Sequence, residues 1–196
     1  MILSNVKIHE ALDRGWLKIT PEPSPRRKVN SSDECPYQTS SVDLRLGSEV
    51  SWLKPGIPAT VDLRKGGFAK LFGPNSETKE ITEDQPYALK PGKFVLAKTL
   101  ERIELPITSN GPCFAARIEG RSSFARSGLL VHFTAPTIHA GFKGTITLEM
   151  INFGPLPILL YPEMAVAQLI IEMVDGVPFD NESQFHGQSR AGGVVG

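Results

Sequence analysis

Short apolar runs separated by proline and glycine constrain the fold of this chain most. Over residues 41–47, apolar and polar side chains alternate as they do in a half-buried β-strand. The 196 residues include 18 Gly and 16 Pro, and many of these lie between the apolar runs, where they favour turns. Many short strands joined by such turns predict a β-sandwich or barrel rather than an alternating βαβ fold. Further strands are expected at Val61 and Leu63 and over 94–100, 114–118, 129–134, 145–153, 157–160 and 165–173.

One helix is expected near the N-terminus. Ile8, Ala11 and Leu12 recur at helical spacing, and Ser4 precedes them where an N-cap residue would stand. Gly15 follows the run and is typical of a helix end. The sequence therefore predicts one short helix before the first strands.

The length is that of one domain. We predict a single domain over 1–196, with a helix and strand over 1–20 and a flexible C-terminal lid over 181–196. The lid segment is polar and Gly-rich and has no periodic apolar face. Residues 20–39 hold several prolines and serines and are expected to form a loop.

The charge balance limits the classes of partner. The chain has 21 Lys+Arg and 21 Asp+Glu, which argues against a broadly basic nucleic-acid binder but permits a local site for a small anion. Cys35 and Cys113 make neither a disulfide scaffold nor a thiolate zinc site. The apolar tract 156–173 is broken by prolines and cannot span a bilayer as a helix. We predict a cytoplasmic protein with no nucleic-acid or membrane partner.

The segment 120–128 is the first candidate for chemistry. Glycines bracket a short helical turn, and Ser122 or Ser123 is expected to cap it. A helix N-terminus suits phosphate, and Arg121 and Arg126 would add charge-assisted hydrogen bonds. An ordinary capped turn with two solvated arginines explains the same spacing equally well.

Glu149 is the second candidate. The strand expected over 145–153 turns Glu149 to the same face as Thr147 and Ile151, away from apolar Leu148. Partial desolvation there would raise the pKa of Glu149 toward the range useful to a general base. The alternative is a carboxylate at a strand edge, paired with a nearby arginine.

Two further segments are weaker candidates. His139 lies in a Pro- and Gly-rich link and is either a surface residue or a ligand contact. The tail over 183–188, with Phe185, His186 and two amides, either folds over a ligand or is simply a disordered tail. The H-x-E and P-C-x-x-C signature of the zinc nucleobase deaminases is absent, because Cys113 has no second cysteine after it.

Together these segments resemble the dCTP deaminase family, within the wider trimeric dUTPase superfamily. The G-R-S-S run starting at Gly120 marks the superfamily, and Glu149 in its I-x-L-E strand, with the N-terminal helix, points to the deaminase branch. The resemblance extends nearly end to end and is carried by residues 15–21, 41–47, 89–92, 120–123, 146–149, 168–170 and 185–188.

The resemblance implies a mainly β subunit with short helices, a distorted β-barrel of the dUTPase-like type, in a homotrimer whose active sites are shared between neighbouring subunits. It implies hydrolytic deamination of dCTP to dUTP and ammonia without zinc, with Mg²⁺ bound through the triphosphate. Two alternatives stay open. One is a dUTP diphosphatase, or a bifunctional deaminase and diphosphatase that forms dUMP. The other is a nucleotide-binding regulator without turnover.

The resemblance also implies residue roles. Glu149 would be the general base and acid that activates water for attack at C4 of cytosine. Ser122 and Arg126 would help hold the water and the phosphates. The segment 134–135 matches the part that shifts in related enzymes when dTTP inhibits. Arg121 and Ser123 would contact the triphosphate, and Thr147, Leu148 and Gln168 would line the nucleoside pocket. Substrate contacts are also implied for Ser122, Arg126, Ala135, His139 and Gln188, of which Gln188 would close the lid.

Four positions depart from the family pattern. Thr137 stands where many relatives have arginine, and His139 stands where they have aspartate. Gln184 replaces a tail lysine, and Phe185 replaces a tyrosine. In dUTPases the matching aspartate positions the water that attacks the α-phosphate. His139 therefore predicts that dUTPase or bifunctional activity is absent.

Overall fold

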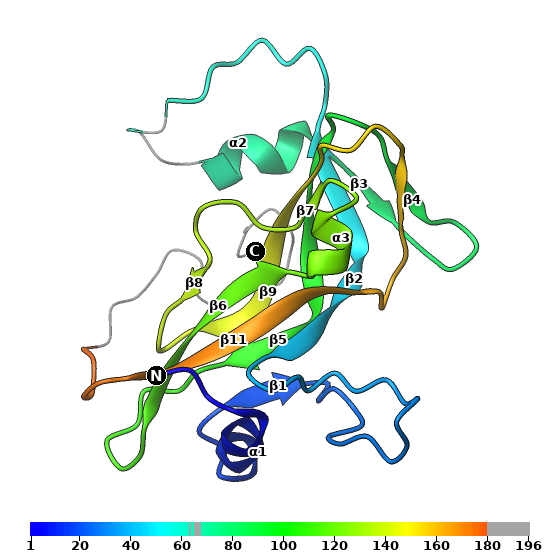
Figure 1. The fold of residues 1–196 in the computed structure, drawn as a ribbon. Helices are drawn as coiled ribbons and strands as arrows, with labels where there is room; N and C mark the ends of the chain where they lie inside the picture. The colour runs from blue at the N-terminus through cyan, green and yellow to red at the C-terminus, as the bar shows by residue number, and fades with distance from the viewer. Residues whose placement is uncertain (63, 65–67, 180–196) are drawn as a thin grey trace.

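The computed structural model describes residues 1–62, 64 and 68–179 and shows a mainly β fold with short helices (Figure 1), which confirms the expected class. The elements in chain order are α1 (Asn5–Asp13), β1 (Lys18–Thr20), β2 (Val42–Leu53), α2 (Phe68–Asn75), β3 (Ser76–Glu80), β4 (Tyr87–Leu89), β5 (Phe94–Glu104), β6 (Cys113–Gly120), α3 (Ser122–Ala125), β7 (Leu129–Leu130), β8 (Thr137–Ile138), β9 (Lys143–Asn152), β10 (Ile158–Leu160) and β11 (Ala165–Val174).

One curled sheet of nine strands makes up most of the molecule. Its main path runs β7-β9-β5-β2-β11-β6-β8, with β1 added beside β5 and β3 beside β2, while β4 and β10 form a separate ribbon. The strand β2 is central because it pairs with β11 on one side and with β5 on the other. It therefore joins the half of the sheet that carries β9 to the half that carries β6.

Period-two alternation explains the core. In β9, Ile146, Leu148 and Met150 are buried while the residues between them are half-buried on the opposite face. Leu44 and Leu46 of β2 join the same apolar cluster. The expected strands over 41–47, 94–100, 114–118, 145–153, 157–160 and 165–173 correspond to β2, β5, β6, β9, β10 and β11.

Some strand predictions were wrong. The strand expected over 129–134 is only the two-residue β7, because its pairing with β9 ends at Leu130 and the chain then bends away. Val61 is 43% exposed and lies in no strand, and Leu63 lies outside the described residues. Alternation did not predict β3 (Ser76–Glu80), because its sequence is polar throughout.

The N-terminal helix has the expected ends. Ser4 is the N-cap of α1, and its Oγ accepts from the backbone N–H of Lys7 at 3.5 Å. Gly15 follows the helix with φ +68, a conformation that glycine adopts at little cost. Ile8 and Ala11 are buried against the sheet.

Apart from Thr20, which ends β1, the loop expected over 20–39 has no helix or strand. In the part of the chain that the structure describes, no helix is long and apolar enough to cross a bilayer. The single domain over 1–196 and the cytoplasmic location stay predictions. The lid expected over 181–196 lies outside the described residues.

A buried amide fixes the end of β9. Asn152 is fully buried, and its Oδ1 accepts from Gly154 N at 2.8 Å. Its Nδ2 donates to the carbonyls of Leu89 and Leu156 at 2.9 and 2.8 Å. A buried amide with all these partners holds the chain in one conformation, because breaking any of the bonds would leave a polar group unsatisfied.

Two glycines dock the α3 turn onto this end of β9. Gly128 has φ +92, and its carbonyl accepts from Phe153 N at 2.8 Å. A Cβ on Gly128 would overlap the backbone of Gly154, and a Cβ on Gly154 would overlap the carbonyl of Ser127. Both positions need glycine for the close approach, and Gly128 also needs it for its backbone angle.

We predict that Gly128→Ala destabilises the protein much more than Gly92→Ala. Gly92 also has a positive φ of +70 but nothing within 4 Å of an added Cβ. Backbone strain alone should cost about 1 kcal/mol at Gly92, and strain plus overlap about 3 kcal/mol or more at Gly128. Urea unfolding of both variants measures the difference. Equal losses of unfolding free energy in the two variants would show that the close approach at Gly128 does not limit the residue there.

Candidate active site

Glu149 stands on the outer face of β9, where alternation predicted it. Its side chain is 32% exposed, and Thr147 and Ile151 share its face. Leu148, which was predicted to contact the nucleoside, is instead fully buried in the core. Its neighbours in the strand point the opposite way, so the structure does not bring the Leu148 side chain to this face.

His132 faces Glu149. Its side chain is only 6% exposed, and its Nδ1 lies 2.5 Å from Glu149 Oε2. Its Nε2 lies 2.9 Å from the carbonyl oxygen of Ala135. Because a carbonyl oxygen only accepts, Nε2 carries a hydrogen and donates it. The Nδ1 contact is close but poorly aligned for a hydrogen bond, so it acts as a contact between charges.

The surroundings of His132 favour its charged form. Burial lowers the pKa of His132, but Glu149, the Ala135 carbonyl and the charge of Glu119 together outweigh it and raise the pKa above its usual 6.5. Glu149 is therefore paired with a histidine rather than with the arginine considered from the sequence. His132 was not predicted from the sequence, although it lies two residues after the end of β7 and β7 pairs with β9.

The α3 turn presents the second group. It has four residues and begins directly after Arg121, which is its N-cap and makes no side-chain capping bond. The prediction that Ser122 or Ser123 caps the turn was therefore wrong, because both serines already lie inside the turn. Their side chains and that of Arg126 are exposed, as groups that meet a ligand from solvent must be.

Arg121 and Gln168 come together around a residue that the sequence did not single out. Gln168 Nε2 donates to Asp43 Oδ1 at 2.8 Å, and Arg121 forms an ion pair with Asp43 Oδ2 at 3.8 Å. Arg121 also donates to the Ala165 carbonyl at 3.2 Å. The predicted phosphate and nucleoside contacts thus share one carboxylate. Asp43 was missed because it looked like one polar position of an alternating strand.

The remaining predicted contacts are more scattered. Ala135 is exposed and reaches the site through its carbonyl bond to His132. Thr137 and His139 are exposed in and just after β8. Gln188, like Gln184 and Phe185, lies outside the described residues.

The candidate residues form two groups. One is Glu149 with Thr147 and His132, and the other is the α3 turn with Arg121 and Gln168. Among the described residues, no hydrogen bond or ion pair joins Glu149 to Ser122 or Arg126. Within one copy of the chain, the Glu149 carboxylate is therefore not bonded to these two residues.

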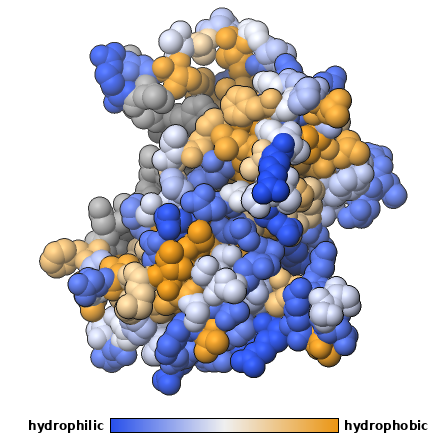
Figure 2. Space-filling model, viewed as in Figure 1, coloured by the Kyte–Doolittle hydropathy of each residue, from blue (hydrophilic) through white to orange (hydrophobic). Residues whose placement is uncertain are grey.

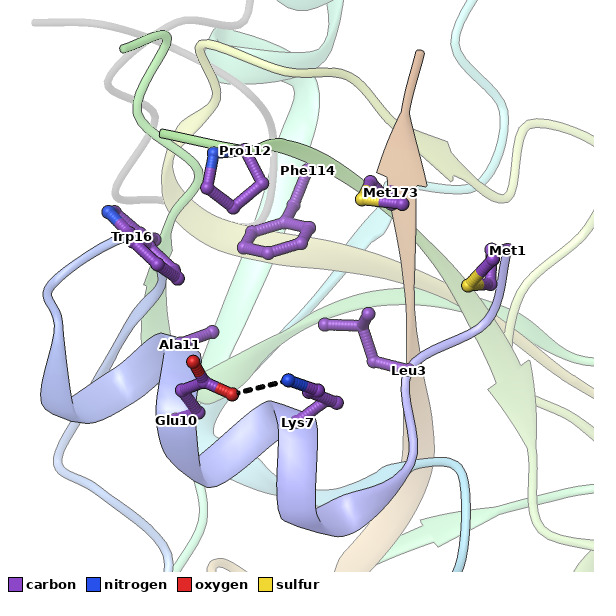
Figure 3. Close-up of a pocket in the computed structure, with 9 residues that line it drawn as sticks. All are labelled: Met1, Leu3, Lys7, Glu10, Ala11, Trp16, Pro112, Phe114 and Met173. Atoms are coloured by element: carbon purple, nitrogen blue, oxygen red, sulfur yellow. Dashed lines mark hydrogen bonds and ion pairs between the residues drawn. The ribbon is translucent and has the colours of Figure 1, made fainter. Parts of the chain in front are cut away.

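A hollow elsewhere in the molecule is separate from both groups (Figure 3). It lies between α1 and the strands β6 and β11, with the Lys7–Glu10 ion pair of 2.7 Å at its edge. Its walls are otherwise largely apolar. They are formed by Met1, Leu3, Lys7, Glu10, Ala11, Trp16, Pro112, Phe114 and Met173.

Comparison with known proteins decides the family. The family model described as dCTP deaminase-like matches residues 2–174. The chain belongs to this family. It is 38% identical over 169 residues to "dCTP deaminase, dUMP-forming" of Dictyoglomus thermophilum, covering 86% of this chain and 78% of the relative. It is 34% identical over 194 residues to the protein of the same name from Methanosphaera stadtmanae, covering 96% and 90%.

Other family members carry the shorter name. "dCTP deaminase" of Rhodospirillum rubrum is 37% identical over 176 residues, covering 88% of this chain and 82% of the relative. Among solved structures, the 2'-deoxycytidine 5'-triphosphate deaminase of Agrobacterium tumefaciens superposes with a TM-score of 0.60 at 20% identity. That match covers 88% of this chain and 48% of the other chain. It confirms the distorted-barrel fold of the family.

The comparisons overturn one expectation. The sequence predicted deamination that stops at dUTP, with His139 as the evidence against a further step. Relatives named as dUMP-forming, at 34–38% identity over most of their length, support the bifunctional alternative instead. The inference from His139 relied on a single exposed position beside a two-residue strand, which is a weaker constraint than similarity along the whole chain.

We predict that the His132–Glu149 pair stabilises the protein in acid more than in base. A histidine whose folded pKa is raised contributes stability that is complete below its unfolded value of about 6.5 and is lost as pH rises through the folded pKa. The free energies of unfolding of the protein and of His132→Gln, measured in urea, should therefore differ most near pH 6 and least at about pH 9.

The partner variant gives the control. In a Glu149→Gln background, His132→Gln should lower the free energy of unfolding by nearly the same amount at every pH, since the carboxylate that raises the pKa of His132 is gone. In the protein that keeps Glu149, a cost of His132→Gln that is the same at every pH would contradict the charged pair.

Proposed function

We propose that this chain is a dUMP-forming dCTP deaminase, which converts dCTP and two water molecules to dUMP, ammonia and pyrophosphate. The relatives named above support this product. The observation that carries the chemistry is the half-buried Glu149 carboxylate held against His132 at 2.5 Å. A carboxylate so placed is suited to proton transfer, because it is fixed in position and only partly solvated.

In the deamination step, Glu149 takes a proton from a water molecule whose oxygen attacks C4 of cytosine. The carboxylic acid then delivers that proton to N3, and the amine leaves as ammonia after a second transfer. His132 contributes by holding the Glu149 carboxylate in place beside the reacting water. Thr147 is on the same face of β9 and is available to the base or sugar.

The triphosphate is proposed to bind the α3 turn. Arg121 and Arg126 supply positive charge there, and Ser122 and Ser123 supply hydroxyls. Binding the phosphates positions the base at Glu149 without taking part in the first chemical step. The second step is attack of water on the α-phosphorus, with pyrophosphate leaving. His139 remains a proposed substrate contact.

Mg²⁺ is proposed to arrive with the nucleotide. Phosphate oxygens are hard ligands that suit this ion, which keeps several of its own waters when bound. Within the described ranges the structure has no cluster of three or more His, Cys, Asp and Glu side chains suited to a metal ion. When bound, the ion would neutralise phosphate charge and so would make pyrophosphate a better leaving group.

We also propose a homotrimer with sites shared between subunits. The support is that Glu149 and the α3 turn form separate groups within one copy. Apolar surface is also exposed close to Glu149. Phe94 pairs in register with Ile151, and the centroids of the Phe94 and Phe133 rings lie 5.7 Å apart. These two phenylalanines are 44% and 41% exposed. Figure 2 shows several such apolar patches interleaved with polar surface.

Inhibition by dTTP and closure by Gln188 stay proposals. The segment expected to respond to dTTP contains Ala135, whose carbonyl bonds to His132. A shift of this segment would therefore reach the residue that faces Glu149.

Product analysis tests the function. With dCTP and Mg²⁺ we expect one ammonia and one pyrophosphate per dUMP formed, without accumulation of free dUTP. Ammonia with dUTP as the end product would contradict the second step, and dCTP binding without any product would indicate a regulator.

The same assay tests the role of Glu149. Glu149→Gln should lower ammonia release by about a thousandfold or more while leaving dCTP affinity nearly unchanged, because it removes the proton acceptor and keeps the shape. Glu80→Gln, an exposed glutamate at the end of β3, is the matched control and should retain full activity. Substantial turnover by Glu149→Gln would show that another group is the base.

A further inference from the structure

Asp43 is a nearly buried carboxylate that the proposed chemistry does not use. Its side chain is 7% exposed at the start of β2, on the face opposite buried Leu44. Its backbone N donates to the Pro36 carbonyl at 2.7 Å. Burying a charged carboxylate is costly unless partners surround it, and its partners indicate what it is for.

Those partners come from three parts of the chain. Gln168 on β11 donates to Oδ1 at 2.8 Å, and Gln38 in the 20–39 loop donates to Oδ2 at 3.3 Å. Arg121, beside the α3 turn, faces Oδ2 at 3.8 Å. Two of these three, Gln168 and Arg121, are residues expected to touch the nucleotide.

The carboxylate fixes which way the Gln168 amide points. An ionised carboxylate only accepts hydrogen bonds, so Nε2 must face Asp43 and Oε1 must face away. Gln168 then offers an acceptor oxygen to a ligand. That oxygen suits a hydroxyl or amino donor on a nucleoside, whereas phosphate oxygens would require a donor.

Arg121 is held differently. It donates to the Ala165 carbonyl at 3.2 Å, and its guanidinium lies 5.6 Å from the centre of the Phe124 ring. Asp43, at 3.8 Å, is beyond hydrogen-bond distance and acts as a countercharge. The guanidinium is thus oriented without being saturated, and its side chain keeps 35% of its surface exposed for a phosphate.

Gln38 extends this arrangement to the loop. It also donates to the Cys35 carbonyl at 3.1 Å, so the loop and the carboxylate are tied together. The loop over 20–39 had no role in the sequence analysis. The Gln38 side chain and the Pro36 carbonyl place this loop against Asp43.

We propose that Asp43 is a positioning residue that orients Gln168 toward the nucleoside and Arg121 toward the triphosphate, with Gln38 holding the carboxylate from the loop. This rests on the proposed function, in which Arg121 binds the triphosphate, and on the expectation from the family resemblance that Gln168 lines the nucleoside pocket. Asp43 itself touches no substrate in this account and acts only through its two neighbours.

Steady-state kinetics with dCTP test the positioning role. Asp43→Asn should raise KM about tenfold, the scale of a lost hydrogen bond to a charged group, and change kcat about twofold or less. Glu172→Gln is the matched control. It removes another outer-face carboxylate, paired with Arg117 at 2.9 Å, and should leave KM unchanged.

Two results would overturn the proposal. An unchanged KM with a lower melting temperature would indicate a purely structural carboxylate. A lower KM would indicate that Asp43 only repels the triphosphate. If Asp43→Asn does not fold, Gln38→Ala replaces it. This variant trims an exposed side chain and should raise KM about threefold through the same carboxylate, and an unchanged KM there would equally overturn the proposal.

A crystal structure of nucleotide-free Asp43→Asn, or of Gln38→Ala in its place, separates this inference from the proposed function. The inference predicts that the Gln168 amide and the Arg121 guanidinium leave their present positions, whatever the substrate is. Both side chains in place would overturn it even if the protein deaminates dCTP. Displaced side chains in a protein that releases no ammonia from dCTP would contradict the proposed function alone.

Discussion

The close approach of Gly128 to Gly154 determines where the candidate site residues stand. It docks the α3 turn onto the end of β9, and the buried Asn152 amide keeps that end in one conformation. Because β7 follows Gly128 immediately and pairs with β9, the same contact carries the chain to His132. The position of His132 against Glu149 is thus a consequence of backbone packing that only glycine allows.

In the proposed mechanism, the Glu149–His132 pair prepares the carboxylate for proton transfer. Alternation along β9 places Glu149 on a half-buried face, and the loop after β7 supplies a buried imidazole whose other nitrogen bonds to a carbonyl. The raised pKa of His132 keeps a positive charge beside the carboxylate. Asp43 has the corresponding part in the proposed phosphate site, where it lies between Gln168, a proposed nucleoside contact, and Arg121, a proposed phosphate contact.

Local sequence patterns predicted most elements of the fold, but they did not predict the contacts between segments that are distant in the sequence. The alternation of apolar and polar residues predicted β2, β5, β9 and β11 and the face of Glu149. Helical spacing of apolar residues after Ser4 predicted α1. Capping of α3 was mispredicted because a four-residue turn starts one residue earlier than its serines suggested. Asp43 and Gln168 are 125 positions apart, and no pattern of apolar residues brings them together. The prediction from His139 was wrong because a single exposed position does not decide the product.

Glu149 and the α3 turn form separate groups within one subunit, and their meeting across a subunit boundary is the central claim of this account. Mixing two inactive variants, Glu149→Gln and Arg126→Ala, after dissociation and reassembly tests it directly. In a cyclic trimer with shared sites, random mixing should restore about a quarter of the normal sites, each with Glu149 from one subunit and Arg126 from its neighbour. If the mixture releases no more ammonia from dCTP than either variant alone, the site lies within one chain and the account is wrong.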